Sequence, residues 1–335
     1  MIQGRPKIMV VGSSNMDLVV RSPRIPIIGE TILGGDFLMV PGGKGANQAV
    51  AAAKLGVEAY LAAKLGNDVF GSQSLANFQK VGVNTEYVTQ TEDAPSGTAL
   101  IIVDDNGDNA IVVAPGANQK LSSEDISRTQ PNIEMFGAIV SQLEIPITTV
   151  EFTAELANKN NIPFILDPAP APDEKLSEKL LRKVDILTPN ETEAEMLTDI
   201  RITDEAAARK ACGVLLKMGV KIVILTMGSK GFFLADNGKE RFVPAMKVDA
   251  VDTTAAGDAF TGSLACFIAK GKTVFEAAIL ANYVAALSVM KRGAQPSMPT
   301  QDEVRHFMNR MKPVKKIEDI SFTAKKGHEI YHIKL

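Results

Sequence analysis

Five short, continuously apolar segments recur along the chain, separated by segments with helical patterns. The apolar segments lie at 7–13, 137–144, 163–170, 184–190 and 221–228. The amphipathic or alanine-rich segments lie at 45–55, 70–81, 147–160, 191–198, 204–218, 257–270, 274–291 and 301–311. Continuous apolar runs are typical of strands buried on both faces of a parallel sheet. The alternation therefore predicts a doubly wound α/β core.

Two segments interrupt this alternation. Residues 17–40 carry prolines and glycines between short extended runs, and residues 97–114 have the pattern of a hairpin around Asp104 to Asp108. We expect them to form a small separate sheet over the carboxyl ends of the core strands, where open α/β sheets bind ligands. The sheet is a candidate lid. A small sheet with one apolar face is not stable alone, and a second copy could cover that face. We therefore also predict a homodimer that forms through the lid sheets.

The composition excludes several classes of protein. Hydrophobic residues make up 45% and charged residues 22% of the chain, which is typical of a compact globular protein. The 36 basic and 39 acidic residues give a formal charge of -3, so neither nucleic acid nor a membrane surface is an expected partner. No signal peptide or membrane helix is visible, which predicts a cytoplasmic protein whose two cysteines are buried free thiols.

A glycine-rich motif, PGGKGANQAVAAAKLG at 41–56, leads into an alanine-rich helix. Gly42, Gly43 and Gly45 would let backbone amides approach a ligand, and Asn47 in the first helical turn could point back at it. A tight turn before a core helix would explain the same residues. The chain has no GxxxxGK[ST] motif and no GxGxxG after a strand, so a P-loop or dinucleotide site is not favoured.

The segment AVDTTAAGDAFTGSLACFIAKG at 250–271 places small residues before an apolar helix. Ala255, Ala256 and Gly257 would present free amides at the positive end of the helix dipole, which is an anion site suited to phosphate. Asp258 in the first turn could accept a proton from an alcohol that attacks this anion. Asp258 could instead only cap the helix, although a cap does not explain the small residues around it.

Two further motifs involve acidic residues or histidines. TPNETEAEML at 188–197 has Asn190, Glu191, Glu193 and Glu195 in the first turns of a helix. These side chains would complement the helix dipole, or Glu193 with Asn190 could orient a hydrated Mg²⁺. HEIYH at 328–332 matches the HExxH zinc pattern, but its strand-forming residues and its place at the end of the chain argue against a zinc site.

Together these motifs resemble the signatures of the ribokinase (PfkB) family of sugar kinases. The resemblance rests on GGKGANQAVAAAKLG, NETEAE, TMGSKG at 226–231, DTTAAGDAF and KRGAQPS at 291–297. It covers about residues 6–311, in the family's order. It implies a three-layer α/β fold with a doubly wound, mostly parallel sheet and a small β-sheet lid. The implied organisation is a kinase domain, 1–311, with lid segments 17–40 and 97–114 inserted, and an extension, 312–335, of unknown role.

The resemblance also implies a reaction, in which ATP phosphorylates D-ribose at the 5-hydroxyl to give ribose 5-phosphate and ADP. Asp258 would be the base, and Ala255, Ala256 and Gly257 would form the anion hole for the transferred phosphoryl group. The matching sugar-binding positions are Asn15, Asp17, Gly43, Lys44, Asn47, Glu144 and Asp258. The matching nucleotide-binding positions are Asn190, Thr226, Gly228, Gly231, Gly257 and Asn282.

Two ions belong to the implied chemistry. Members of the family use Mg²⁺ with ATP, and Glu193 would act on it through water. They also carry an activating monovalent cation, usually potassium, held mostly by backbone carbonyls. The matching potassium positions are Asp252, Thr254, Ser288, Lys291, Gly293 and Ser297.

Two alternatives remain. Another kinase of the family could act on a nucleoside, fructose or a related sugar, but a nucleoside needs an apolar slot and a sugar phosphate needs basic side chains. The expected sugar-site side chains, from Asn15 to Glu144, suit an uncharged polyol. A sugar-sensing binding module could keep the fold without the chemistry, but a sensor has no use for a base such as Asp258 beside an anion hole.

Overall fold

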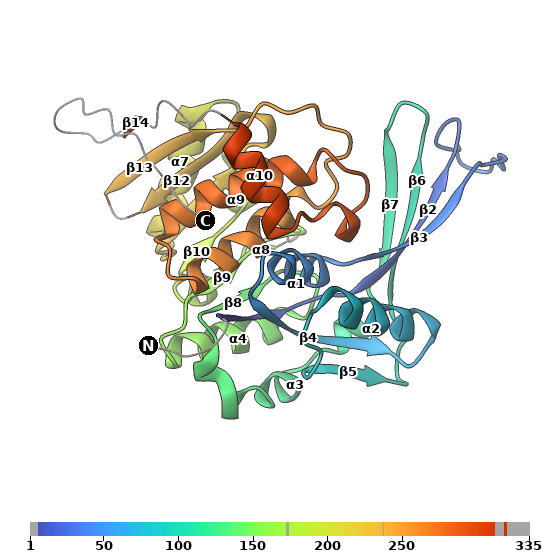
Figure 1. Ribbon diagram of the computed structural model, residues 1–335, viewed down its shortest axis with the longest axis horizontal. Helices are drawn as coiled ribbons and strands as arrows, with labels where there is room; N and C mark the ends of the chain where they lie inside the picture. Colours follow the sequence, from blue (N-terminus) through green and yellow to red (C-terminus); the bar gives the residue numbers. More distant parts are fainter. Residues whose placement is uncertain (1–5, 172–173, 237, 312–317, 320–335) are drawn as a thin grey trace.

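A ten-stranded, mostly parallel sheet forms the centre of the computed structural model, which describes residues 6–171, 174–236, 238–311 and 318–319 (Figure 1). The strands follow the order β14-β13-β12-β11-β10-β9-β8-β1-β4-β5. Their bounds are β1 Lys7–Val11, β4 Glu58–Gly66, β5 Val88–Thr91, β8 Ala138–Ser141, β9 Phe164–Leu166, β10 Ile186–Leu187, β11 Ile222–Thr226, β12 Gly231–Asp236, β13 Lys239–Pro244 and β14 Glu318–Asp319.

Strand β1 lies at the point where the strand order reverses. It pairs in parallel with β4 on one side and with β8 on the other, and β9, β10 and β11 continue the parallel sheet beyond β8. At one edge of the sheet, among the described strands, β11 pairs antiparallel with β12, β12 with β13 and β13 with β14. The predicted doubly wound, mostly parallel sheet is confirmed. Such a reversal leaves a crevice at the carboxyl ends of the strands, and ligands bind there.

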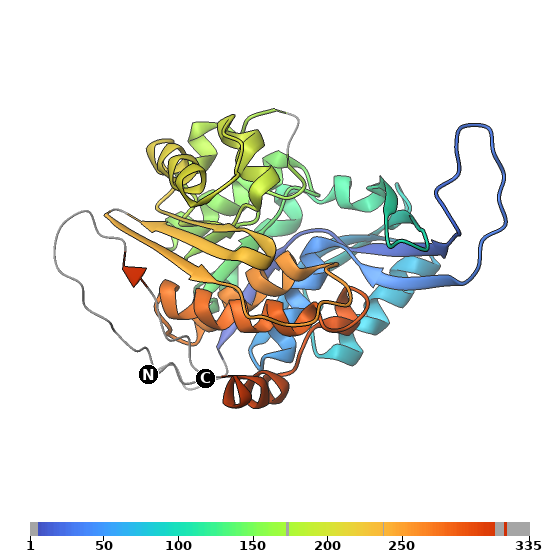
Figure 2. The same ribbon diagram turned by 90° about the horizontal axis from the view of Figure 1, so that it is seen from above.

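Helices cover both faces of the sheet and complete three layers (Figure 2). Their bounds are α1 Lys44–Lys54, α2 Val69–Val81, α3 Ser123–Ser127, α4 Ile147–Lys159, α5 Glu178–Leu181, α6 Glu191–Thr198, α7 Glu205–Lys217, α8 Ala256–Ala269, α9 Val274–Ser288 and α10 Gln301–Arg310. Short 3₁₀ helices lie at η1 Gly116–Lys120, η2 Gln130–Met135, η3 Gly228–Lys230 and η4 Gln295–Ser297.

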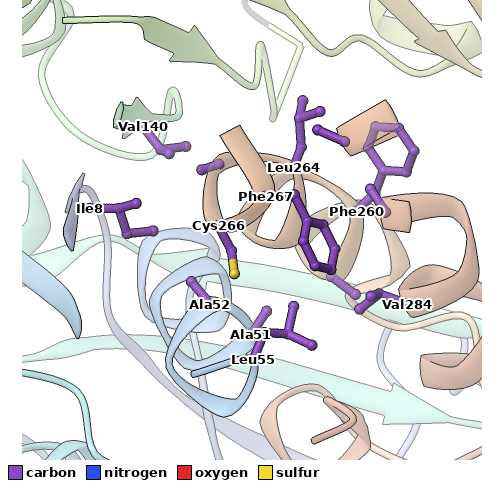
Figure 3. Close-up of a cluster of buried hydrophobic side chains, with 14 of the residues drawn as sticks. Ile8, Ala51, Ala52, Leu55, Val140, Phe260, Leu264, Cys266, Phe267 and Val284 are labelled. Atoms are coloured by element: carbon purple, nitrogen blue, oxygen red, sulfur yellow. The ribbon is translucent and has the colours of Figure 1, made fainter. Parts of the chain in front are cut away.

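The sheet separates two hydrophobic cores. Ile8 and Val10 of β1 face the core that contains α1, α8 and α9, whereas Met9 and Val11 face the core that contains α4 and α7. This alternation explains the continuous apolar runs, because strands buried on both faces need apolar residues at every position. Figure 3 shows the first core, with Ile8, Val140, Ala51, Ala52, Leu55, Phe260, Leu264, Cys266, Phe267 and Val284.

A separate four-stranded sheet has the order β3-β2-β6-β7 and projects from the body (Figures 1 and 2). Its strands are β2 Asn15–Arg21, β3 Phe37–Gly42, β6 Gly97–Val103 and β7 Asn109–Ala114. The predicted hairpin around Asp104 to Asp108 is the antiparallel turn between β6 and β7. The predicted small sheet is therefore confirmed. Apolar side chains along it, including Leu38, Leu100 and Val112, are more than half exposed.

The sequence patterns missed several strands. Strand β4 has the sequence EAYLAAKLG, whose alanines carry little strand propensity. The hairpin of β12 and β13 and the short β5 were also missed, and all three extend the sheet towards its edges. The predicted C-terminal extension and the HEIYH motif lie outside the described residues, apart from Glu318–Asp319. Within the described residues, no helix has both the length and the apolar character needed to cross a membrane.

Candidate active site

The candidate sugar side of the site forms where β1 passes into β2 and α1 begins. Gly43 has a left-handed φ of 89°, and a Cβ atom added to it would lie 2.6 Å from the Asn15 amide nitrogen. A Cβ atom on Gly45 would lie 2.7 Å from the backbone of Gly12. The glycines of the GGKG motif therefore let the helix start pack directly against the end of the first strand. This packing places the predicted residues Asn15, Asp17, Gly43 and Lys44 together.

Four carboxylates lie near Lys44, and three of them, those of Asp167, Glu193 and Asp258, are buried. The Lys44 amide donates to Glu144 Oε2 at 3.1 Å, and the Ser13 hydroxyl donates to the same oxygen. Burial alone would lower the pKa of Lys44. The negative charges of four nearby carboxylates outweigh this effect and raise the pKa above its ordinary value; they belong to Asp258, Asp167, Glu144 and Glu193. Lys44 is therefore a fixed positive charge at the centre of an acidic cluster.

Asp17 projects from the lid strand β2 towards the same cluster. Its burial, followed by the nearby charges of Glu144 and Asp258, raises the pKa of Asp17 to about 7. Within the part of the chain that the structure describes, the Asp17 carboxyl group has no hydrogen-bond donor, so it can accept hydrogen bonds from hydroxyl groups of a ligand. The lid sheet thus contributes a polar group directly to the candidate sugar site.

Asp258 lies in the first turn of α8 and is almost completely buried. Asn47 Nδ2 donates to Asp258 Oδ2 at 2.8 Å, and Gln48 Nε2 donates to Oδ1 at 3.1 Å. Burial raises the pKa of Asp258, while Lys44 and the two amide donors oppose that effect. The alternative that Asp258 only caps its helix is wrong, because the N-cap position of α8 is Ala255 and no side chain caps this helix start.

The start of α8 provides backbone donors beside Asp258. Ala255 adopts a left-handed φ of 60°, which turns the chain sharply into the helix. The Ala256 amide, one of the three predicted anion-hole donors, already donates a hydrogen bond to Thr253 O at 3.2 Å. A Cβ atom on Gly257 would meet no atom within 4 Å. The uncapped helix start and this open space fit an anionic group of a ligand.

A cavity of about 520 Å³ opens on the other side of the same turn. All six of the predicted nucleotide-binding residues line it: Asn190, Thr226, Gly228, Gly231, Gly257 and Asn282. Apolar side chains of Met246, Val248 and Val289 also line it. Asn282 uses its amide to donate to Pro244 O at 2.9 Å, which fixes one wall of the cavity. A mainly apolar lining with a few polar side chains, such as Asn190 and Thr226, next to the amides at the start of α8 suits a molecule with a charged end and a flat apolar part.

Asn190 and Glu193 form a reciprocal capping box at the start of α6. Asn190 donates from its backbone nitrogen to Glu193 Oε2 and from its side-chain Nδ2 to Glu193 Oε1, at 2.8 Å each. The predicted complement to the helix dipole is therefore present. Both oxygens of Glu193 already accept hydrogen bonds, so Glu193 fits a role towards a cation through water better than direct binding. Among the described residues, no group of three or more His, Cys, Asp or Glu could hold a metal ion.

The predicted potassium residues lie on two chain segments, 252–254 and 288–297, that are held together by hydrogen bonds. Val251 and Asp252 donate from their amides to Val289 O, and Gly293 donates to Asp252 Oδ2 at 2.8 Å. Asp252 Oδ1 accepts from the Thr254 amide at 2.9 Å. The first segment carries Asp252 and Thr254, and the second carries Ser288 at the end of α9, Lys291, Gly293 and Ser297 of η4. The Lys291 ammonium forms an ion pair with Glu303. Lys291 could therefore contribute to a cation site only through its backbone carbonyl oxygen.

Several residues of the site were not anticipated from the motifs. Asn118 in η1 accepts from the Ser14 amide at 2.9 Å and donates to Asn15 Oδ1 at 2.7 Å, which orients the Asn15 side chain. Gln48, Gln142 and Asp167 form a buried network with Asp258. Gln48 directly follows Asn47 in the glycine-rich motif, so its neighbour could have pointed to it. Asn118 and Gln142 belong to no motif that the sequence analysis identified. The prediction of two buried free cysteines, Cys212 and Cys266, is confirmed.

Comparisons with known proteins agree with this arrangement. Residues 5–301 match the family model described as pfkB family carbohydrate kinase. The chain belongs to this family, and it is a sugar kinase that transfers a phosphoryl group. It is 40% identical to the ribokinase of Haemophilus influenzae over 91% of this chain and 99% of that protein. It is also 38% identical to the deoxyribokinase of Salmonella typhimurium over 90% of this chain and 98% of that protein.

The solved structures give the same result. The ribokinase of Arabidopsis thaliana, in complex with ribose and ATP, matches with a TM-score of 0.84 and 34% identity over 92% of this chain and 100% of that one. The ribokinase of Thermotoga maritima matches with a TM-score of 0.80 and 38% identity over 90% of this chain and 99% of that one. The fold and the family predicted from the motifs are confirmed.

Proposed function

We propose that this protein transfers the terminal phosphoryl group of ATP to the 5-hydroxyl of D-ribose, which gives D-ribose 5-phosphate and ADP. The observation that carries the proposal is the position of Asp258 between two different halves of the site. Asp258 accepts a hydrogen bond from Asn47 in the polar cluster, and its neighbour Gly257 lines the cavity. Similarity to ribokinases, one of them in complex with ribose and ATP, supports the same substrates.

In this mechanism Asp258 is the general base. It accepts the proton of the sugar hydroxyl as the hydroxyl oxygen bonds to the terminal phosphorus of ATP and the bond to the bridging oxygen of ADP breaks. Asn47 and Gln48 hold the carboxylate in one orientation. A positioned base contributes a factor of ~10² to 10⁴, and alignment of the reactants can contribute ~7 to 11 kcal/mol. Positioning therefore supplies most of the rate enhancement.

The start of α8 stabilises the charge of the transferred group. The Gly257 amide and the positive end of the helix dipole lie where Ala255 turns the chain, next to the open space beside Gly257. Lys44 adds a positive charge on the sugar side. Mg²⁺, which Glu193 would hold through water, would neutralise charge on the ATP phosphates. Potassium would be held by oxygen atoms of the loops at Asp252 to Thr254 and Ser288 to Ser297, and would steady the turn at Ala255.

The lid sheet has two roles in this proposal. It brings Asn15 and Asp17 to the sugar, and it covers the site so that water does not accept the phosphoryl group. Its exposed apolar side chains, such as Leu38 and Val112, would be covered by the lid of a second copy in a homodimer. Nucleic acid and membranes are not expected partners, and a cytoplasmic location stays a prediction.

The experiment that tests this function is a substrate panel. Purified protein receives ATP, Mg²⁺ and one of D-ribose, 2-deoxyribose, fructose, adenosine or ribose 5-phosphate, each at the same low concentration, and ADP release is measured with and without potassium. We expect ribose to react fastest and potassium to increase the rate. Faster reaction with adenosine, fructose or a phosphosugar would contradict the ribose assignment, and the absence of any turnover would support a sensor instead.

A further inference from the structure

Two buried glutamines connect Asp258 to a second carboxylate, Asp167. Gln142 follows β8 directly and donates from Nε2 to Gln48 Oε1 at 2.6 Å. The Nε2 nitrogen of Gln48, on α1, donates to Asp258 Oδ1 at 3.1 Å and to Asp167 Oδ2 at 2.8 Å. Both glutamines are 0% exposed. The chain of contacts thus joins the ends of β8 and β9 to the first turns of α1 and α8.

The geometry leaves Gln48 one orientation. A primary amide nitrogen carries two hydrogens, and Gln48 directs them to two different carboxylates. Rotating this amide by 180° would place its oxygen against both carboxylates and its nitrogen against the Gln142 donor. Two buried acceptors and one buried donor would then lose their partners, which is costly away from water. Gln142 and the two carboxylates together therefore fix the orientation of Gln48, and Gln48 in turn holds one oxygen of each aspartate.

The two oxygens of Asp258 are held by different donors. Asn47 donates to Oδ2, and Gln48 donates to Oδ1. With one donor on each oxygen the plane of the carboxylate is determined, while further acceptor positions stay free for a hydroxyl group of the substrate. Both donors belong to the recognised glycine-rich motif, and Gln48 gives the second constraint and links Asp258 to Gln142 at the end of β8.

We propose that Gln48, oriented by Gln142 and anchored on Asp167, is a positioning residue that holds Asp258 in the orientation and the charged state that proton abstraction requires. This inference rests on the proposed function, because it takes Asp258 as the base. It assigns no direct contact with the substrate to Gln48, Gln142 or Asp167.

The proposal predicts that two variants shift the pKa of Asp258 in opposite directions. The titratable groups that face this cluster are Lys44, Asp17, Glu144, Asp167 and Glu193. Burial raises the pKa of Asp258, and the Gln48 donor opposes the rise. Losing that donor should raise this pKa further. The charge of Asp258 raises the pKa of Asp167. Because repulsion between two carboxylates acts on both of them, removing the charge of Asp167 should lower the pKa of Asp258.

The test compares Gln48→Met with Asp167→Asn. The pH dependence of kcat is measured with saturating ribose and MgATP, and the acid limb reports the base in the bound complex. We expect the acid limb of Q48M to move up by about one pH unit and that of D167N to move down. Gln142→Met keeps Gln48 but removes its orienting donor, so it should shift the limb in the direction of Q48M by less. Gln73→Met, on the exposed surface of α2, is the matched control and should not shift it.

Two results would overturn the proposal. One is a Q48M enzyme with the acid limb and kcat of the wild type. The other is a shift of Q48M and D167N in the same direction, which would indicate general damage to the site. If Q48M does not fold, an unshifted limb in Q142M overturns it. Failure of the wild type to phosphorylate ribose would count against the proposed function, whereas an active wild type with unshifted variants counts only against the positioning role.

Discussion

The two halves of the site are built in different ways. On the sugar side, charged and amide side chains from α1 and α8 are buried and bonded to one another, as in the contacts of Asn47 and Gln48 with Asp258. On the nucleotide side, glycines, alanines and apolar side chains line an open cavity of about 520 Å³. The first half has its polar groups fixed before a ligand arrives, and the second offers space and backbone amides.

This difference indicates how each half achieves selectivity. A preorganised polar cluster rejects a substrate that leaves its groups unpaired, because unpaired buried polar groups are costly. A mainly apolar cavity tolerates more variation in what fills it. We therefore expect changes on the sugar side to have larger effects than comparable changes on the nucleotide side. The following predictions are arranged by expected size.

The largest effect should come from Asp258→Asn, which keeps the shape but removes the base. We expect turnover of ribose to fall by about 10²- to 10⁴-fold, while ribose still binds. Turnover is measured by ADP release, and ribose binding by calorimetry. Unchanged turnover would remove Asp258 from the mechanism, and lost binding would show that the variant damages the sugar side as a whole.

Gly43→Ala should disturb the sugar side of the site by straining the backbone at the start of α1. Its left-handed φ of 89° and the Asn15 nitrogen 2.6 Å from an added Cβ atom leave no room for a methyl group. We expect a loss of about 2 kcal/mol or more in the free energy of unfolding and weaker ribose binding. Urea denaturation measures the first and calorimetry the second. A stability equal to that of the wild type would contradict the tight packing of α1 against β2.

Asp17→Asn should change the pH dependence of stability. Asp17 has a pKa of about 7 in the folded protein, whereas an unfolded aspartate titrates near ~4, so the folded state binds more protons between these values. This group therefore lowers stability as pH rises from about 4 to about 7. Without ligand, D17N should be more stable than wild type by about 1–2 kcal/mol at pH 8 and equal to it near pH 4. Urea denaturation at both pH values measures this, and an equal difference at both would refute it.

Gly257→Ala is the matched change on the nucleotide side and should have the smallest effect on stability. Nothing lies within 4 Å of its added Cβ atom, and alanine has a higher helix propensity than glycine. We expect unchanged stability or a gain of up to ~1 kcal/mol. The KM for ATP should still rise several-fold, because the methyl group enters the cavity. A destabilisation like that of G43A would erase the contrast between the two halves.

The recognised motifs anticipated more of the nucleotide side than of the sugar side. Gly228, Gly231 and Gly257 belong to motifs that the sequence displays openly, and they line the cavity together with Asn282. On the sugar side the motifs named Asn15, Asp17 and Asn47 but not Asn118 or Gln142. A glycine at a turn has local causes that a motif can show, whereas a buried amide is defined by partners that lie far along the chain, such as Asn15 for Asn118.

The sequence alone determined the class of fold and the family, because apolar periodicity and short motifs follow from local chemistry: continuous apolar runs for strands buried on both faces, and small residues at helix starts. It did not show β4, whose alanines are buried by their neighbours and not selected by propensity. Only the tertiary structure decided that Asp258 receives its hydrogen bonds from α1 and not from its own helix. Burial and hydrogen-bond partners depend on which segments meet in space, and a linear pattern does not contain that information.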